Sequence, residues 1–201
     1  AAHGIAVHAY VLMTNHIHLL VSPETAHSLP RAMKHVNWRY SRYVNDTQAR
    51  TGSLWEGRYR AAIIDLEKYF FHCSCYIELN PVRASLATAP GDYLWSSYHA
   101  NALGKADPLI TRHAMFMSLD SDGVRRSAVY RQMIMEGVPQ SAVEAIRTAT
   151  NGGWALGDDA FSARVAAMSG RRAQPLPRGR PRLHGVVELN EARAFLEEGG
   201  Q

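Results

Sequence analysis

The chain has 201 residues, of which 46% are hydrophobic and 20% are charged, and its formal net charge is +4. This size and apolar content suit one compact domain with an appendage, and no apolar run approaches the roughly 18 residues of a membrane-spanning helix. Cys73 and Cys75 are too close in sequence to form an ordinary disulfide framework. We therefore expect a cytoplasmic protein with reduced thiols.

The first predicted elements are strands over about 6–13 and 16–22, where valine, isoleucine, leucine and tyrosine predominate. This pattern leaves open whether they are two strands or one long bent strand. A helix is predicted from Ser28 to about Asp46. A further strand is predicted over 59–64, where the sequence reads Tyr-Arg-Ala-Ala-Ile-Ile.

The next predicted element is a helix over 66–79 that begins after Asp65 and ends at Pro81. The residue before a proline disfavours the helical conformation, which is why Pro81 is expected to end it. Beyond residue 105 the apolar spacing predicts four more helices, over 111–119, 123–136, 139–150 and 158–169.

Two histidines, His16 and His18, flank one isoleucine at the start of the second predicted strand. Side chains in a strand alternate between its faces, so both imidazoles lie on one face, about 6.5–7 Å apart along the strand. Two such imidazoles can bind one divalent metal ion. The alternative is a pair of hydrogen-bonded histidines beside the core, and the pattern alone does not decide between them.

The helix predicted over 66–79 carries a polar stripe formed by Tyr69, His72, Tyr76 and Asn80. If this helix packs near the two histidines, Asn80 can complete a metal shell and Tyr76 can act as a nucleophile on phosphorus. Tyr69 is the rival nucleophile, although no amide follows it one turn later as Asn80 follows Tyr76. A plain solvent-facing stripe is the alternative to both.

Basic residues are concentrated in two parts of the chain. Residues 31–60 contain seven bases and two acids, and aromatic side chains are interleaved with them. Residues 171–182 contain five arginines and no acid. Clustered arginines among aromatic side chains are typical of surfaces that bind phosphates and stack nucleobases. The alternative is an ordinary solvated basic face.

Three motifs, at 15–21, 52–59 and 76–84, resemble the single-tyrosine HUH transposases, and most of all their REP-associated tyrosine transposase branch. The resemblance implies a fold of the α+β class with a ferredoxin-like antiparallel sheet, the HUH endonuclease fold. It implies cleavage and rejoining of single-stranded DNA at hairpin repeats through a 5′-phosphotyrosine intermediate. Family members open with a strand and a long helix, so these two elements are expected to be missing at the N-terminus of this chain.

Carried over by position, the resemblance makes Tyr76 the nucleophile and His16, His18 and Asn80 the ligands of Mg²⁺ or Mn²⁺. The expected partner is hairpin or single-stranded DNA in a bacterial, nucleoid-associated setting, and the branch favours a monomer over a homodimer. The residues expected to contact DNA, from the basic segments and the motifs, are Arg31, Lys34, Arg39, Arg42, Trp55, Arg58, Tyr59, Arg60, Arg83, Arg178, Arg180 and Arg182.

The predicted organisation has a catalytic domain over 1–104, a helical region over 105–170, and an Arg/Pro/Gly-rich tail with an acidic end over 171–201. Within the tail, Arg-Gly-Arg-Pro at 178–181 resembles an arm that lays arginines into a narrow minor groove. Two other functions remain open. One is a domesticated protein that binds hairpin DNA without useful catalysis, and the other is a metal-dependent phosphodiesterase that uses water as its nucleophile.

Overall fold

The structure, a computed structural model, describes residues 3–175. It begins with two antiparallel strands, β1 (Ile5–Leu12) and β2 (Ile17–Pro23), that form a hairpin. The chain therefore makes two strands here rather than one bent strand. Near the turn Val11 pairs with His18 and Leu12 pairs with Ile17. Three residues of β1 are buried: Ala9 and Val11 have no surface exposed to solvent, and His8 is 7% exposed.

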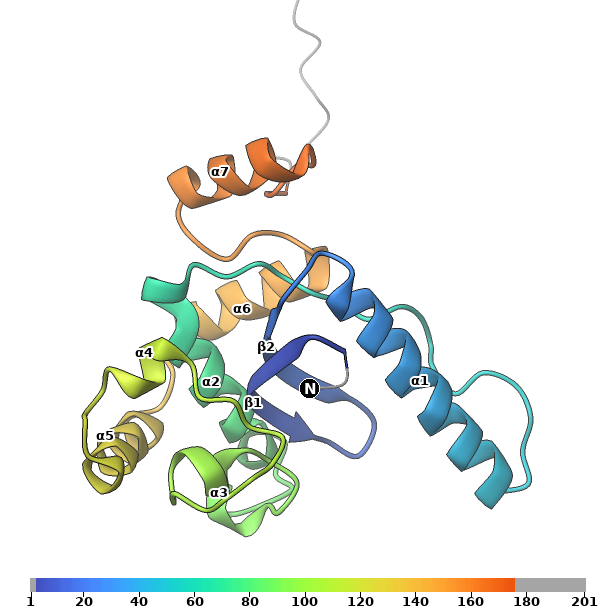
Figure 1. The fold of residues 1–201 in the computed structure, drawn as a ribbon, viewed down its shortest axis with the longest axis horizontal. Coiled ribbons are helices and arrows are strands. Elements are labelled where there is room, and N and C mark those ends of the chain that lie inside the picture. Colours follow the sequence, from blue (N-terminus) through green and yellow to red (C-terminus); the bar gives the residue numbers. More distant parts are fainter. Residues whose placement is uncertain (1–2, 176–201) are drawn as a thin grey trace, which may run out of the picture.

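Helix α1 (Ser28–Thr47) follows the hairpin and agrees with the predicted helix. It lies along one side of the sheet and extends away from the rest of the molecule (Figure 1). Met33 and Val44 are the apolar side chains that it buries, whereas Trp38, Tyr40 and Tyr43 are 58%, 50% and 64% exposed. Exposing half or more of an aromatic side chain to water is unfavourable in free energy. This face of α1 is therefore suited to contact another molecule.

Helix α2 (Leu66–Arg83) is the central element of the fold. It contacts both strands and the helices α4, α5 and α6. Phe70, Cys73 and Ile77 are buried on it, as expected for its apolar stripe. The expectation that Pro81 ends the helix is wrong, because α2 continues to Arg83. A proline removes one backbone hydrogen bond from a helix. Two features offset this loss: the ring of Pro81 is buried, and a hydrogen bond from Ala84 N to Asn80 O closes the last turn.

The strand predicted over 59–64 does not form. Only an isolated bridge joins Ile64 to Leu156, with backbone hydrogen bonds from Leu156 N to Ile63 O and from Asp65 N to Leu156 O. Strand propensity describes how well side chains fit a sheet, and this segment has no neighbouring strand to pair with in the described residues. The segment is extended and fastened to the C-terminal region instead.

The four helices predicted beyond residue 105 form, although the first is shorter than predicted. They are α4 (Ala114–Met117), α5 (Gly123–Glu136), α6 (Gln140–Gly152) and α7 (Asp159–Ser169). The 3-10 turn η1 (Pro90–Asp92) and the short helix α3 (Tyr98–Asn101) precede them. Phe116, Tyr130, Val143 and Ile146 join the same apolar cluster as Val11 and Phe70. The antiparallel sheet and its covering helices confirm the α+β class. No helix of residues 3–175 combines the length and the apolar character that crossing a bilayer requires.

A carboxylate lies at the centre of this shared core. Glu78, on α2, is completely buried and accepts hydrogen bonds from Ser97 Oγ, Asn101 Nδ2 and Tyr130 Oη at 2.5, 2.8 and 3.0 Å. Desolvation by burial raises the pKa of Glu78 to about 7, against the pull of these three donors. The donors connect α2 to α3 and α5, so this group joins the first hundred residues to the C-terminal helices.

Glu78→Gln should change how stability depends on pH. The folded protein keeps a proton on Glu78 that the unfolded chain, with a pKa near 4.5, has already lost. Stability of the wild type therefore falls as the pH rises from about 4.5 to about 7, by on the order of 3 kcal/mol in total. Glutamine does not titrate, so its contribution to the unfolding free energy does not change with pH. The unfolding free energy of the variant minus that of the wild type should therefore rise between these two pH values, which urea titrations at each pH measure. Parallel curves of unfolding free energy against pH for the variant and the wild type would contradict this.

Candidate metal and nucleophile site

The two histidines lie at the turn of the hairpin. His16 is the last residue before β2, and its carbonyl accepts a hydrogen bond from Met13 N at 2.9 Å, which closes the turn. His18 is the second residue of β2. Their Nε2 atoms are 3.1 Å apart, and their ring planes are nearly perpendicular, at 89°. The predicted arrangement of both imidazoles on one face is therefore present.

Asn15 holds the imidazole ring of His16 in place. The Nδ1 atom of His16 is 2.6 Å from Asn15 Oδ1, and an amide oxygen can only accept, so Nδ1 donates this hydrogen bond. Metal-binding histidines are commonly oriented in this way by a second hydrogen bond. For His18, desolvation and the neighbouring His16 lower the pKa to about 4. This shift favours the neutral form of His18, the form that binds metals.

Tyr76, on α2, lies beside this pair. Its ring centroid is 5.8 Å from that of His18, and the two rings meet edge to face at 78°. The residue is buried, with 7% of its surface exposed. The solvent-facing alternative for this helical stripe is therefore wrong at Tyr76, and α2 does pack near the histidines. The rival Tyr69 instead faces His72, at 6.1 Å, and lines a groove with Pro139 of the chain before α6.

Asn80 lies one turn after Tyr76 and is buried. Its Nδ2 donates to the carbonyl of Tyr76 at 2.9 Å, which orients the amide along the helix. Among the described residues no hydrogen bond reaches its Oδ1. This oxygen therefore keeps both lone pairs for another ligand, and its role toward a metal remains a prediction.

The donor set fits a divalent ion. Two neighbouring donors, each about 2.1–2.2 Å from an octahedral ion, stand roughly 3 Å apart, which is close to the separation of the two Nε2 atoms. Within residues 3–175 no third histidine, cysteine, aspartate or glutamate joins them. With the predicted amide oxygen of Asn80 and with water, the two imidazoles would form a mixed set that suits a first-row divalent ion such as Mn²⁺, or Mg²⁺.

Two arginines surround Tyr76. The Arg83 guanidinium carbon is 5.7 Å from the centroid of the Tyr76 ring. Arg147 of α6 places its Nε 3.5 Å from the phenolic oxygen. Sequence patterns pointed to Arg83 but not to Arg147, which is 71 residues away from Tyr76 along the chain. Nothing in local spacing could have identified this contact.

The first 80 residues, which contain the histidine pair and Tyr76, match a known family. Residues 1–80 match the family described as transposase IS200-like, and the matched segment contains both histidines, Tyr76 and Asn80. This segment is therefore similar to the transposase IS200-like family. Neither the curated proteins nor the solved structures give a match. The α+β architecture is compatible with the HUH-type fold of the IS200-like domain.

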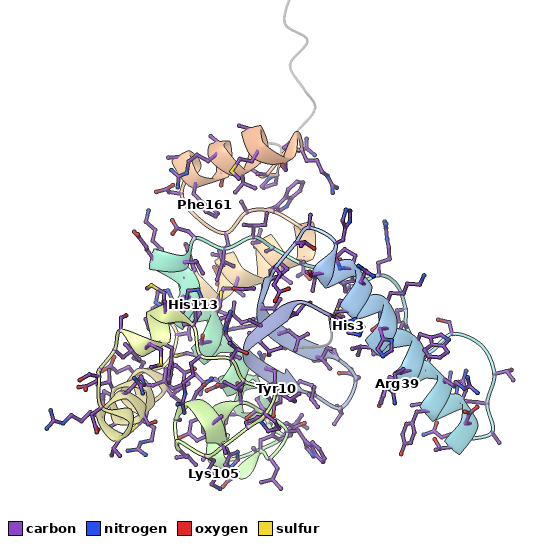
Figure 2. The ribbon with its side chains drawn as sticks, in the orientation of Figure 1. His3, Tyr10, Arg39, Lys105, His113 and Phe161 are labelled. Atoms are coloured by element: carbon purple, nitrogen blue, oxygen red, sulfur yellow. The ribbon has the colours of Figure 1, made fainter. Side chains whose placement is uncertain are left out.

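The IS200-like domain presents its basic residues mainly on α1. Arg39 lies on this helix at the edge of the molecule (Figure 2). Its side chain, with those of His35, Trp38, Arg42, Tyr43 and Asp46, lines a shallow open depression. Arg42 is 3.6 Å from Asp46 and also lies 5.9 Å from the Trp38 ring. Arg31 and Lys34 are exposed on the same helix. This surface combines cations with accessible aromatic faces.

The loop between α1 and α2 adds to this surface of the IS200-like domain. Trp55 donates from Nε1 to Asn37 O at 3.1 Å and packs 5.8 Å from Tyr40, so it is fixed on α1. Arg58 and Tyr59 are exposed. Arg60 bonds to Asn151 Oδ1 at 2.7 Å, so it is held against α6 rather than on α1. The arginines predicted in the tail, Arg178, Arg180 and Arg182, lie outside the described residues.

Proposed function

We propose that this protein is a transposase-type nuclease and strand transferase that uses Tyr76 as its nucleophile. The IS200-like domain indicates a transposase activity on DNA. The observation that carries the finer proposal is the placement of Tyr76 against His18, whose Nε2 converges with that of His16. A nucleophile beside two converging imidazoles is what a metal-assisted phosphoryl transfer needs.

The proposed reaction is a transesterification. The phenolic oxygen of Tyr76 forms a bond to phosphorus, and the bond from phosphorus to the DNA 3′ oxygen breaks. The phenol gives up its proton to water, and the departing 3′ oxygen takes one from water to leave as a 3′-hydroxyl. The phosphotyrosine ester conserves the energy of the broken bond, so a second 3′-hydroxyl can attack it and rejoin the strand.

His16, His18 and Asn80 are the residues that would hold Mg²⁺ or Mn²⁺. A divalent ion bound there supplies Lewis-acid polarisation of a non-bridging phosphoryl oxygen. The protein's own contribution is orientation. Asn15 holds the His16 ring with Nε2 directed toward His18, and α2 holds the Tyr76 ring beside His18. We also propose hairpin DNA of the REP-associated kind as the substrate and a monomer as the active unit.

The α1 surface is the proposed track for the DNA backbone. Its exposed bases would neutralise phosphates, and the faces of Trp38 and Tyr43 would stack unpaired nucleobases. Phosphate contacts of this kind release counterions, so they make binding depend on salt.

Arg39→Gln with Arg42→Gln should weaken binding to single-stranded hairpin DNA. Two lost phosphate contacts should flatten the slope of log affinity against log salt by about 1.4, because each contact on a single strand contributes about 0.7. Fluorescence anisotropy over a salt series measures this slope. The matched control is Arg125→Gln with Arg164→Gln, which removes two positive charges from α5 and α7. Equal slopes for the two double variants would argue against the α1 track.

A labelled hairpin oligonucleotide tests the proposed function. The full-length protein is incubated with the DNA and Mn²⁺ or Mg²⁺, and denaturing gels reveal covalent protein–DNA species. A 5′-phosphotyrosine link retains the downstream fragment, so a 3′ label should move with the protein and a 5′ label should appear in free DNA. Cleavage without any covalent species would indicate a phosphodiesterase that uses water. Binding without cleavage would indicate a domesticated binding protein.

A further inference from the structure

The environment of Tyr76 contains a cation that comes from outside the IS200-like segment. Helix α6 begins at Gln140, sixty residues after the matched segment ends. Ala142, Val143, Ile146 and Ala149 of this helix are buried and hold it on the common core. Arg147 follows directly after Ile146, at the border of that buried stripe, and reaches Tyr76. The position of its side chain is thus set by tertiary packing.

The contact has a defined polarity. A guanidinium has only donors, so the Nε of Arg147 donates and the phenolic oxygen of Tyr76 accepts, at 3.5 Å. Arg147 is exposed, and no carboxylate pairs with it among residues 3–175. Its terminal nitrogens are therefore available to an anion beside the phenol.

We propose that Arg147 is a catalytic residue, which holds the attacking oxygen of Tyr76 and receives the phosphate under attack. This inference rests on the proposed function. As the phenol oxygen bonds to phosphorus, negative charge spreads over the oxygens of the transition state. A planar guanidinium can contact the phenolic oxygen through Nε and a phosphoryl oxygen through a terminal nitrogen at the same time. The C-terminal helices then complete the active site of the IS200-like domain.

Arg147→Ala tests this role. At saturating hairpin DNA, the rate of adduct formation should fall about 100-fold, as for loss of one donor to a developing oxyanion. DNA affinity should change far less, since Arg147 is one of many basic residues. Arg147→Lys should recover only part of the rate, because an ammonium cannot bridge two oxygens as a guanidinium does. Arg125→Ala, which removes an exposed arginine from α5, is the matched control and should keep the wild-type rate.

Added guanidinium ion separates a chemical role from a structural one. It should restore part of the rate of Arg147→Ala and leave Arg125→Ala unchanged, at a concentration that does not unfold either variant. An undiminished rate in Arg147→Ala would overturn the proposal while the proposed function stands. A slow variant that guanidinium does not rescue, with a lowered unfolding midpoint, would also overturn it. A wild-type protein that forms no adduct would overturn the proposed function and this role together.

Discussion

Tyr76→Phe should abolish the covalent protein–DNA adduct. The change removes a single oxygen, the atom that is proposed to bond to phosphorus, and no other group of the site can replace it. The ring itself stays, so its packing against His18 and under Arg83 is retained. The cost in stability should be small, since only one long hydrogen bond to Arg147 is lost. Denaturing gels with 3′-labelled hairpin DNA measure the adduct.

The control for Tyr76→Phe lies two turns earlier on the same helix. Tyr69→Phe removes an equivalent hydroxyl from a side chain that faces His72 and the groove before α6, without contacting the histidine pair. This variant should form the adduct at the wild-type rate. An undiminished adduct in Tyr76→Phe, or a lost adduct in Tyr69→Phe, would reassign the nucleophile.

The second large effect is expected from the histidine pair. His16→Ala with His18→Ala removes both converging Nε2 atoms, so cleavage should fall below detection and Mn²⁺ binding should weaken by at least about 10-fold. Binding of hairpin DNA should largely persist, because the α1 surface is unchanged. Isothermal titration with Mn²⁺ alone reports on the metal site without any need for DNA or activity.

The control for the histidine pair is His27→Ala, an exposed residue before α1 whose side chain caps nothing. It should bind Mn²⁺ and cleave DNA as the wild type does. If the double variant loses DNA binding or the folded state along with cleavage, the pair has a structural role beside the core. Unchanged Mn²⁺ affinity in the double variant would remove the metal site from the account.

The local parts of this site could be predicted from the sequence. Alternation along β2 placed His16 and His18 on one face, and helical periodicity placed Tyr76 and Asn80 on one stripe of α2. These are properties of neighbouring residues, so they need no knowledge of the fold. The elements α1, α5, α6 and α7 were predictable for the same reason, because their apolar residues recur with helical spacing.

Long-range features could not be predicted in this way. The segment 59–64 has strand-like composition, yet only Leu156 pairs with it, and a pairing partner is not encoded in the segment itself. Glu78 reads as an ordinary polar residue of a helix until Ser97, Asn101 and Tyr130 are seen to surround it. Arg147 was missed for the same reason, because its contact with Tyr76 depends on how α6 packs against α2.

Mass spectrometry of the trapped adduct tests the central claim most directly. The adduct is trimmed with nuclease and digested with trypsin, which releases residues 69–83 as one peptide that carries both Tyr69 and Tyr76. Fragmentation of that peptide locates the nucleotide remnant. The account predicts a 5′-phosphonucleotide on Tyr76. A remnant on Tyr69 or in any other peptide, or cleaved DNA with no modified peptide, would contradict it.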